Sequence, residues 1–237
     1  KLNLQMFIRS LLFYLLLSCW TIFLGLVCLP YLILSNKHLV KPVKLWIRGI
    51  FFLLQNICKI THEIQGIGHF PGHAVLIASK HQSAFETLAL FYYLPQSIFI
   101  HKKQLFLIPI FGQYLKKINM ISIDRKGGAV TMRRMLKETK IKVSKGFSII
   151  IFPEGTRKRP GEKPDYKSGF VGIYKAMGTE ILPIAVNSGN YWPKHTFVKN
   201  SGHIIIKILP LISSSIDKKQ ILKDVEITIE KATNKII

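Results

Sequence analysis

A run of 25 uncharged residues, from Ser10 to Leu34, is the feature of this sequence that most limits how the chain can fold. As an α-helix the run would be roughly 37 Å long, enough to cross a hydrocarbon core of about 30 Å with some tilt. A buried core helix seldom stays apolar on every side for this length. The apolar region of a cleaved signal peptide is normally only about 7–15 residues long. We therefore expect this segment to insert into a membrane.

Two details of the same region leave the mode of insertion open. Pro30 lies near the end of the run and can break a helix, so the region forms either one spanning helix or a helical hairpin that dips into one leaflet. A second apolar stretch, residues 46–58, carries Arg48 and Gln55, which is more typical of an interfacial helix than of another span. Residues 1–60 are thus predicted to form an N-terminal membrane anchor.

Basic residues flank the apolar run on both sides. Two precede it and four follow it closely: Lys1 and Arg9, then Lys37, Lys41, Lys44 and Arg48. Because loops rich in Lys and Arg tend to stay on the cytoplasmic side, this imbalance favours an inner or cytoplasmic membrane with the following domain on its cytoplasmic side.

The composition combines a high apolar content with strong basicity. Apolar residues make up 49% of the chain, and 34 Lys and Arg outnumber 12 Asp and Glu, which gives a formal charge of +22. Such a charge suits nucleic acid, an anionic membrane surface or a phosphorylated small molecule. The basic residues are spread along the chain, and the sequence contains no zinc-finger, ribonucleoprotein or basic-zipper motif, which argues against a nucleic-acid partner.

After Gly66, short runs rich in β-forming residues alternate with longer helical patterns. The predicted strands are Ala74–Ser79, Ser97–His101, Met120–Asp124, Phe147–Phe152, Ile181–Asn187 and His203–Leu209. The predicted helices are Ala84–Tyr93, Leu105–Lys117, Gly128–Ser144 and Gly169–Gly178, with another after Ile216. This alternation predicts a single α/β domain, residues 61–237, with a largely parallel sheet. In such a sheet ligands bind beyond the carboxyl ends of the strands.

The first candidate site follows the strand Ala74–Ser79. His81 and Glu86 are five residues apart, so they can meet only if His81 lies in a turn and Glu86 in the first turn of the next helix. A base held by a carboxylate in this way could activate a hydroxyl. The same segment also has the form of a capping box, with Ser83 as N-cap, so Glu86 could instead serve only to cap the helix.

Two further groups of polar residues follow predicted strands. The segment Phe152–Arg157 supplies Glu154, Gly155, Thr156 and Arg157, of which the glycine, hydroxyl and guanidinium suit an anion site. Glu154 would repel a phosphate, so we expect it to hold the loop or to position Arg157; a surface turn closed by a salt bridge is the alternative. Cations also follow two other strands, namely Lys102, Lys103 and Arg125.

Together these segments resemble the glycerolipid acyltransferase family, most closely its 1-acylglycerol-3-phosphate acyltransferases. His81 and Glu86 match the family's His-x4-Asp motif, and Phe152–Arg157 matches its Phe-Pro-Glu-Gly-Thr-Arg motif at every position. The apolar strand with a central proline is matched by Ile181–Val186. The remaining motif is matched by Lys102, Lys103, Leu105, Pro109, Gly112, Ile123 and Arg125.

The resemblance implies an acyl transfer in a membrane. His81 would take the proton of the free sn-2 hydroxyl of 1-acylglycerol 3-phosphate, which then attacks the thioester of acyl-CoA or acyl-carrier protein to give phosphatidate. The acidic partner would fix the imidazole tautomer, while Arg125, Arg157 and one of Lys102 and Lys103 would hold the phosphate. The resemblance implies no metal and no cofactor beyond the acyl donor.

Two residues depart from the family pattern. Glu86 stands where the family usually has Asp, and Lys80 stands where it usually has Asn before the histidine. A cation at Lys80 would assist phosphate or thioester binding, or lower the pKa of His81 by repulsion. Two other functions stay open at this point: acylation of a different lysolipid, and a membrane-anchored protein that binds anionic lipid without turning it over.

Overall fold

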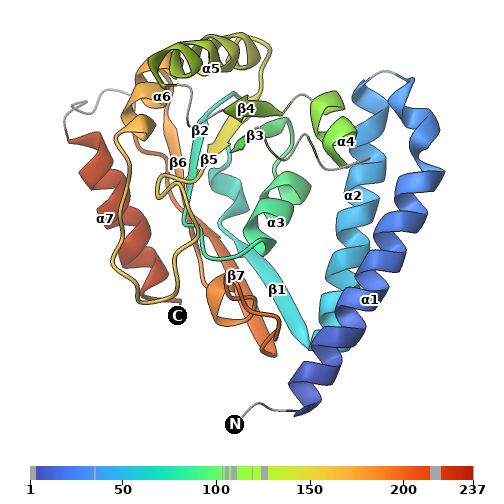
Figure 1. Cartoon of the computed structure of the whole chain (residues 1–237). Helices are drawn as coiled ribbons and strands as arrows, with labels where there is room; N and C mark the ends of the chain where they lie inside the picture. The colour runs from blue at the N-terminus through green and yellow to red at the C-terminus, as the bar shows by residue number, and fades with distance from the viewer. Residues whose placement is uncertain are drawn as a thin grey trace.

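A seven-stranded sheet with helices on both faces forms the body of the protein in the computed structural model (Figure 1). The structure describes residues 4–34, 36–102, 104, 107, 111–118, 120–123, 128–213 and 220–236. The strands are β1 (Ile60–Gln65), β2 (Leu76–Ser79), β3 (Ser97–Lys102), β4 (Ile121–Ile123), β5 (Ser148–Ile151), β6 (Ile181–Val186) and β7 (Gly202–Ile208). The helices are α1 (Leu4–Val27), α2 (Asn36–Leu53), α3 (Phe85–Tyr93), α4 (Phe111–Lys117), α5 (Gly128–Val143), α6 (Gly169–Met177) and α7 (Ile221–Thr233).

The sheet has the order β1-β7-β6-β2-β5-β3-β4 and is largely parallel, as predicted. Strands β2 to β6 all run in one direction, whereas β7 pairs antiparallel with β6 and β1 pairs parallel with β7. The six predicted strands are present with ends shifted by no more than two residues. Strand β1 was not predicted, because it lies at the edge of the sheet and exposes Thr61 and Glu63, so its apolar pattern is weak.

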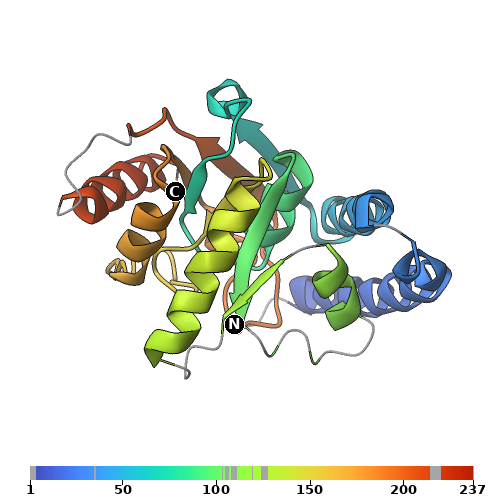
Figure 2. The ribbon, with the colours of Figure 1, turned by 90° about the horizontal axis from the view of Figure 1, so that it is seen from above.

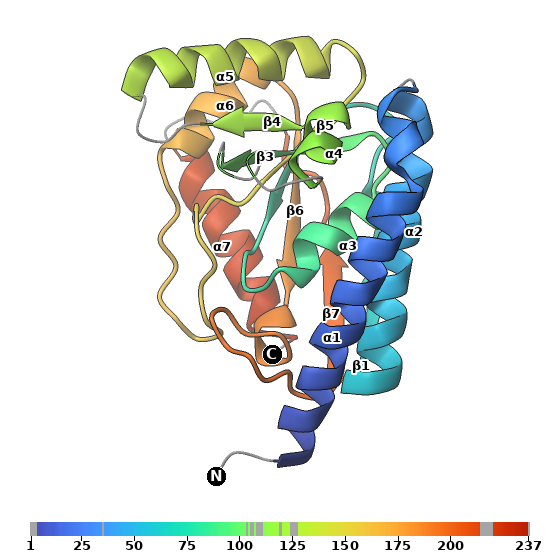
Figure 3. The same ribbon diagram turned by 45° about the vertical axis from the view of Figure 1, so that its right-hand side comes forward.

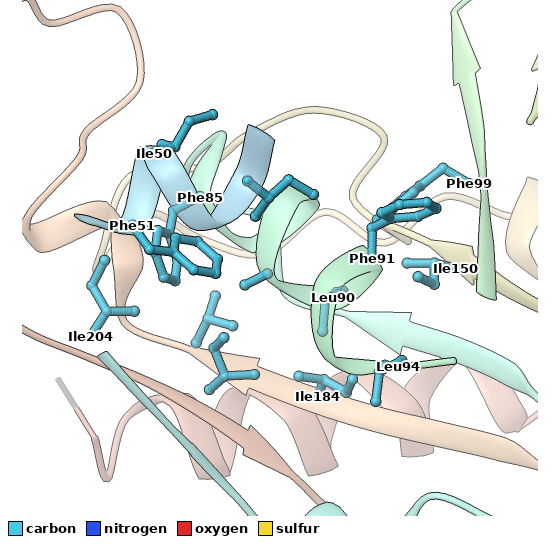
Figure 4. Packing of buried hydrophobic residues seen from close by; sticks show 14 of the residues in the cluster. Ile50, Phe51, Phe85, Leu90, Phe91, Leu94, Phe99, Ile150, Ile184 and Ile204 are labelled. Atoms are coloured by element: carbon cyan, nitrogen blue, oxygen red, sulfur yellow. The ribbon is translucent and has the colours of Figure 1, made fainter. Parts of the chain in front are cut away.

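Buried side chains alternate between the two faces of the sheet, as the twofold period of a strand requires. On β2, Ile77 faces the cluster formed with α1, α2 and α3, whereas Leu76 and Ala78 face the cluster formed with α5, α6 and α7. Figure 2 shows these two sets of helices on opposite sides of the sheet. Figure 4 shows α3 packing Phe85 and Leu90 within the first cluster.

The N-terminal segment forms a helical hairpin of α1 and α2 that lies beside the sheet domain (Figure 3). Helix α1 ends at Val27, and a 3₁₀ turn at Leu29–Leu32 contains Pro30. By length and composition, α1 is the one helix within the described ranges that could cross a membrane. The expected interfacial helix at residues 46–58 is longer than predicted, since α2 already begins at Asn36.

The hairpin and the sheet share one hydrophobic core. Phe13 of α1 and Ile47 and Ile50 of α2 are almost fully buried and belong to the same cluster as Ile184 of β6. The indole of Trp20 in α1 also donates to the carbonyl of Trp46 in α2 over 3.1 Å. At the predicted boundary, residue 60, the chain enters the sheet, and the segments on its two sides share one hydrophobic core.

Candidate active site

The turn that follows β2 brings His81 to the carboxyl edge of the sheet. Strand β2 lies between β5 and β6 and runs parallel to both. The amide of Lys80 continues the pairing with β6 by donating to the carbonyl of Ile184 over 2.9 Å. The segments that follow β2, β5 and β6 therefore meet at one edge, which is where ligands bind in sheets of this kind.

His81 and Glu86 form a hydrogen-bonded pair in the geometry that the sequence required. His81 lies in the turn and Glu86 lies in the first turn of α3, with Nδ1 of His81 2.8 Å from Oε1 of Glu86. The carboxylate is fully buried, whereas the imidazole is 16% exposed. Because an ionised carboxylate can only accept, Nδ1 carries the proton and the lone pair of Nε2 is available as a base.

Glu86 also holds the turn that leads into the helix, although the N-cap position of α3 is Ala84 and not Ser83 as predicted. Its Oε1 accepts from the amides of Gln82 and Ser83, each over 2.7 Å. Helix α3 begins at Phe85, two residues beyond Ser83, and the hydroxyl of Ser83 accepts from the Phe85 amide over 3.1 Å. One carboxylate thus orders the turn and orients the imidazole.

The ring of His81 also packs against an aromatic residue that follows the neighbouring strand of the sheet. Phe152 follows β5, and its ring stacks on the imidazole with centroids 3.8 Å apart and an interplanar angle of 13°. Phe99 of β3 stacks in turn on Phe152 with centroids 5.8 Å apart. The imidazole is therefore fixed both by a hydrogen bond and by a flat apolar surface.

Lys80 points away from the imidazole into a buried ionic cluster. Its Nζ donates to Oε1 of Glu154 over 2.8 Å and to Oε1 of Glu230, on α7, over 2.7 Å. Tyr166 donates to the same oxygen of Glu230 over 3.1 Å. Only 2% of Lys80 is exposed, so the expectation that it assists phosphate or thioester binding does not fit this geometry.

Glu154 holds the loop, which was one of the two roles expected for it. Its second oxygen accepts from the amide of His81 over 3.1 Å, and its side chain is completely buried. Burial raises the pKa of this carboxyl, and the hydrogen bond from Lys80 opposes the rise. Both oxygens of Glu154 therefore accept hydrogen bonds from the protein, as expected for a residue that holds the loop.

The rest of the Phe152–Arg157 segment wraps around the His81 turn. Gly155 has a φ of 66°, in the left-handed region that favours glycine, and closes a tight turn onto the carbonyl of Phe152. Just beyond Arg157, the amide of Lys158 donates to the carbonyl of His81 over 2.8 Å. Thr156 is exposed and Arg157 is partly exposed, so both remain accessible to a ligand beside the histidine.

Three expected phosphate-binding residues fall outside the described side chains. Lys103 and Arg125 are not among the described residues, and Lys102 is described only as the last residue of β3. Strands β3 and β4 are parallel neighbours, with Lys102 opposite Ile123. The roles of these three cations therefore stay predictions.

Comparisons with known proteins agree with the family that these motifs resemble. A protein-family model described as Acyltransferase matches residues 61–187 of the chain. A Pseudomonas aeruginosa protein named 1-acyl-sn-glycerol-3-phosphate acyltransferase is 32% identical over 206 residues, which cover 86% of this chain and 80% of that protein. The chain belongs to the acyltransferase family. It is therefore an enzyme, as the sequence motifs predicted.

Two other comparisons agree with this membership in the acyltransferase family. A relative of the same name from Limnanthes douglasii is 29% identical, and the match covers 75% of this chain and 60% of that protein. The solved structure of the 1-acyl-sn-glycerophosphate (LPA) acyltransferase PlsC from Thermotoga maritima has a TM-score of 0.80 at 21% identity. It covers 97% of this chain and 95% of that one, which shows that the two share a fold.

The site of this acyltransferase also contains residues that the sequence analysis did not single out. Ser188, in the loop after β6, donates from Oγ to Oε2 of Glu86 over 2.6 Å. In the same loop, the amide of Gly189 donates to Oε1 of Gln82 over 3.1 Å, and Nζ of Lys194 donates to Oγ1 of Thr156 over 3.3 Å. The family motif at Ile181–Val186 marks strand β6 and could have directed attention to the residues that follow it.

An apolar cavity of about 350 Å³ lies between the helical hairpin and the sheet. Its wall is formed by α1, α2, α3, α4 and strand β3, with Phe99, Leu88, Phe91, Trp46 and Leu115 among the lining residues. Phe99 also stacks on Phe152, which stacks on His81, so two aromatic rings connect the wall of the cavity with the imidazole. Within the described ranges, no three His, Cys, Asp or Glu side chains gather as a metal site would require.

Proposed function

We propose that this acyltransferase transfers an acyl group from acyl-CoA or acyl-carrier protein to the sn-2 hydroxyl of 1-acylglycerol 3-phosphate, giving phosphatidate for phospholipid biosynthesis. The observation that carries the proposal is the His81–Glu86 pair at 2.8 Å, with the Phe152–Arg157 loop hydrogen-bonded to it. The names of the relatives support this choice of acceptor.

The proposed chemistry uses the free nitrogen of the imidazole. Nε2 of His81 accepts the hydroxyl proton while the hydroxyl oxygen attacks the thioester carbonyl carbon. The tetrahedral intermediate then collapses, the carbon–sulfur bond breaks, and the leaving thiolate takes the proton back from Nε2. Glu86 stabilises the imidazolium in between, and general-base assistance of this kind contributes about 10²–10⁴-fold. Such a transfer needs neither a metal nor a covalent acyl-enzyme.

The acceptor's phosphate is proposed to bind beside the histidine. Arg157 can engage it bidentately and Thr156 can donate its hydroxyl, since both are accessible and their loop is bonded to the backbone of His81. Lys102 or Lys103, together with Arg125, completes the proposed set. The apolar cavity behind Phe99 is proposed to accommodate an acyl chain, for which its lining and its volume are suitable.

The helical hairpin is proposed to attach the enzyme to one leaflet of the bilayer. Helix α1 touches the body near both of its ends, because the amide of Lys199 donates to Ser10 over 2.8 Å and Tyr114 donates to the carbonyl of Gly25 over 2.9 Å. A helix held along the body in this way is better suited to lie in the interface than to cross the membrane. Its outward side chains, such as Leu15 and Phe23, remain exposed for contact with lipid.

The proposed orientation places the catalytic domain on the cytoplasmic side of the inner or cytoplasmic membrane. There the donors acyl-CoA and acyl-carrier protein are available, and the net charge of +22 favours an anionic leaflet. Lys and Arg near such a surface contribute about 1 kcal/mol each. The same charge would concentrate the anionic acceptor.

A panel of acceptors tests the proposed function. Purified enzyme in vesicles would be given labelled acyl-CoA or acyl-carrier protein, with lysophosphatidate or with lysolipids that carry a larger headgroup. We expect phosphatidate to be the main product. Faster acylation of another lysolipid would correct the acceptor. Binding of anionic lipid without any acyl transfer would overturn the proposed function.

A further inference from the structure

The loop after β6 contacts the His81–Glu86 pair through Ser188. Strand β6 runs parallel to β2, with Ile184 opposite Ser79, so the residues that follow the two strands lie side by side. Asn187 pins the start of the loop, because its Oδ1 accepts from the amide of Ile205 over 2.7 Å and its Nδ2 donates to the carbonyl of Ile236 over 2.9 Å. The position of Ser188 is thus set by the sheet itself.

Ser188 and the carboxylate it contacts are both fully buried. Its Oγ donates to Oε2 of Glu86 over 2.6 Å, and each residue has 0% exposure. The neighbouring Gly189 holds the loop close to the turn, since a Cβ there would lie 2.9 Å from Cβ of Gln82 and from the ring of Pro160. Among the described residues, Ser188 is the hydrogen-bond donor to Oε2 of Glu86.

The two oxygens of Glu86 therefore have different partners. Oε1 accepts from Nδ1 of His81 and from two amides of the turn, whereas Oε2 accepts from Ser188. The terminal torsion of a glutamate is soft, so the backbone of α3 does not by itself fix the plane of the carboxylate. A donor on Oε2 fixes that plane and keeps Oε1 directed at the imidazole.

We propose that Ser188 is a positioning residue that acts through Glu86 on His81. The proposal rests on the proposed function, in which His81 is the general base. Without the hydroxyl, Oε2 is left buried without this partner, and the carboxylate can gain another donor only by rotating. Such a rotation would take Oε1 away from Nδ1 and lower the chemical rate, with little effect on how the acceptor binds.

The test is a double-mutant cycle between Ser188→Ala and Glu86→Ala, measured as acyl transfer to lysophosphatidate in vesicles. We expect Ser188→Ala to lower kcat about tenfold or more with KM nearly unchanged. In the Glu86→Ala background the same substitution should have no further effect, because the group it acts through is gone. Ser188→Cys, which keeps a weak donor of similar size, should recover part of the lost rate.

Ser148→Ala is the matched control. Ser148 is also a buried serine, 2% exposed, whose Oγ accepts from the amide of Val75 over 3.1 Å at the opposite end of the strands. The Ser148→Ala variant should have the kcat of wild type. Thermal melting would show whether each variant is folded. If Ser188→Ala does not fold, the Ser188→Cys variant and its cycle with Glu86→Ala take its place.

Three outcomes would overturn the positioning role. A wild-type kcat in folded Ser188→Ala would do so, and so would an equal loss in both backgrounds, which would indicate a general structural effect. A loss confined to KM would place Ser188 in acceptor binding instead. If the wild-type protein itself transfers no acyl group, the proposed function fails, and the positioning role fails with it.

Discussion

Glu86 is a fully buried carboxylate surrounded by four hydrogen-bond donors. Nδ1 of His81 and two amides of the turn donate to one oxygen, and Ser188 donates to the other. Hydrogen bonds to an ionised acceptor are about twice as strong as neutral ones, which offsets the cost of burying the charge. The same interactions that stabilise the turn therefore hold the imidazole in the tautomer that a general base needs.

Replacing Glu86 with Gln removes the charge of the side chain but keeps an oxygen that accepts hydrogen bonds from the turn. The amide oxygen of Gln can still accept from the two amides of the turn, so Glu86→Gln should keep its fold and its melting temperature within a few degrees. It cannot stabilise an imidazolium, so we expect kcat to fall by about 10²-fold or more. The measurement is acyl transfer per folded protein in vesicles. A turnover near that of wild type would show that Glu86 is only a cap.

Replacing Lys80 should affect the stability of the fold more than the chemistry of the site. Asn, the residue usual in the family, is too short to bond both Glu154 and Glu230, so Lys80→Asn would leave Glu154 buried without its cation. Breaking a buried ion pair in this way costs about 3–5 kcal/mol. We therefore expect a clear fall in melting temperature at pH 7, with Lys231→Asn, at an exposed site on α7, as the unaffected control.

The loss of stability in Lys80→Asn should depend on pH. Burial already raises the pKa of Glu154 above its ordinary value of 4.5, and loss of Lys80 removes a hydrogen bond that lowers it. As the pH falls from 7 towards that raised pKa, Glu154 takes up a proton in the folded state and no longer needs a cation. The destabilisation should therefore shrink at lower pH. An equal fall in melting temperature at every pH would contradict this explanation.

At the scale of elements, one loop connects the helical hairpin of α1 and α2 with the turn that holds His81. Ser188 lies at its start beside Glu86, and Lys199 lies near its end against α1. Nζ of Lys199 donates to the hydroxyl of Tyr14 over 2.6 Å and to the carbonyl of Phe197 over 2.9 Å. Only 2% of Lys199 is exposed, so α1 is attached to the body through a buried cation.

Stability at this attachment should change with pH. Burial lowers the pKa of Lys199 from 10.5 to about 8, so between these values the folded state binds fewer protons than the unfolded state. Linkage then makes the contribution of Lys199 to stability rise with pH across that window, by up to about 3 kcal/mol. Lys199→Met carries no charge, so its melting temperature relative to wild type should decrease from pH 8 to pH 10.5. A constant difference would contradict a buried charge at this site.

The elements that sequence could predict are those with a strong repeating pattern. The buried strands, such as β6 with all six of its residues buried, stand out as apolar runs, and the apolar front end stands out by length. Edge strand β1 has polar residues at four of its six positions and was missed. Helix α2 starts ten residues before the predicted residue 46, because its lysines and Pro42 interrupt the apolar pattern.

The site was predictable where residues are close in sequence. The spacing of His81 and Glu86, with the strand before them, allowed their contact, and the resemblance to the family predicted it. Ser188 is 102 residues away from Glu86, and a lone serine carries no signal of its own before the strand order is known. The pairing of Lys80 with Glu230 is equally remote, which is why Lys80 was expected near the substrate rather than in a buried cluster.

At the scale of the whole molecule, exposed large apolar side chains gather on the helical hairpin. The hairpin of α1 and α2 exposes large apolar side chains such as Leu15 and Phe23 on one side, while α7 lies on the other side of the sheet (Figure 2). The carboxyl edge of the sheet connects the two, because the loop after β6 touches α1 and Glu86. This arrangement would let a lipid acceptor enter from the bilayer while a thioester donor enters from water.

A matched pair of substitutions tests the assigned membrane face. Leu15 of α1 is 57% exposed and Ile227 of α7 is 53% exposed, so each can become Asp without disturbing the core. A charge in the hydrocarbon region costs about 2.5–3.5 kcal/mol, so Leu15→Asp should weaken binding to anionic vesicles by about 100-fold. Ile227→Asp should bind as wild type does. Equal binding of both variants would contradict the assigned face.

The most direct test of the central claim is acyl transfer to lysophosphatidate in vesicles, comparing wild-type protein with His81→Ala. The turn at His81 is held by backbone amides and carbonyls and by the carboxylates of Glu86 and Glu154, without the imidazole, so the variant should fold and bind anionic vesicles as wild type does. We predict that wild type forms phosphatidate and that His81→Ala lowers kcat by about 10²–10⁴-fold. Phosphatidate formation by folded His81→Ala at the wild-type rate would show that the proposed general base is wrong.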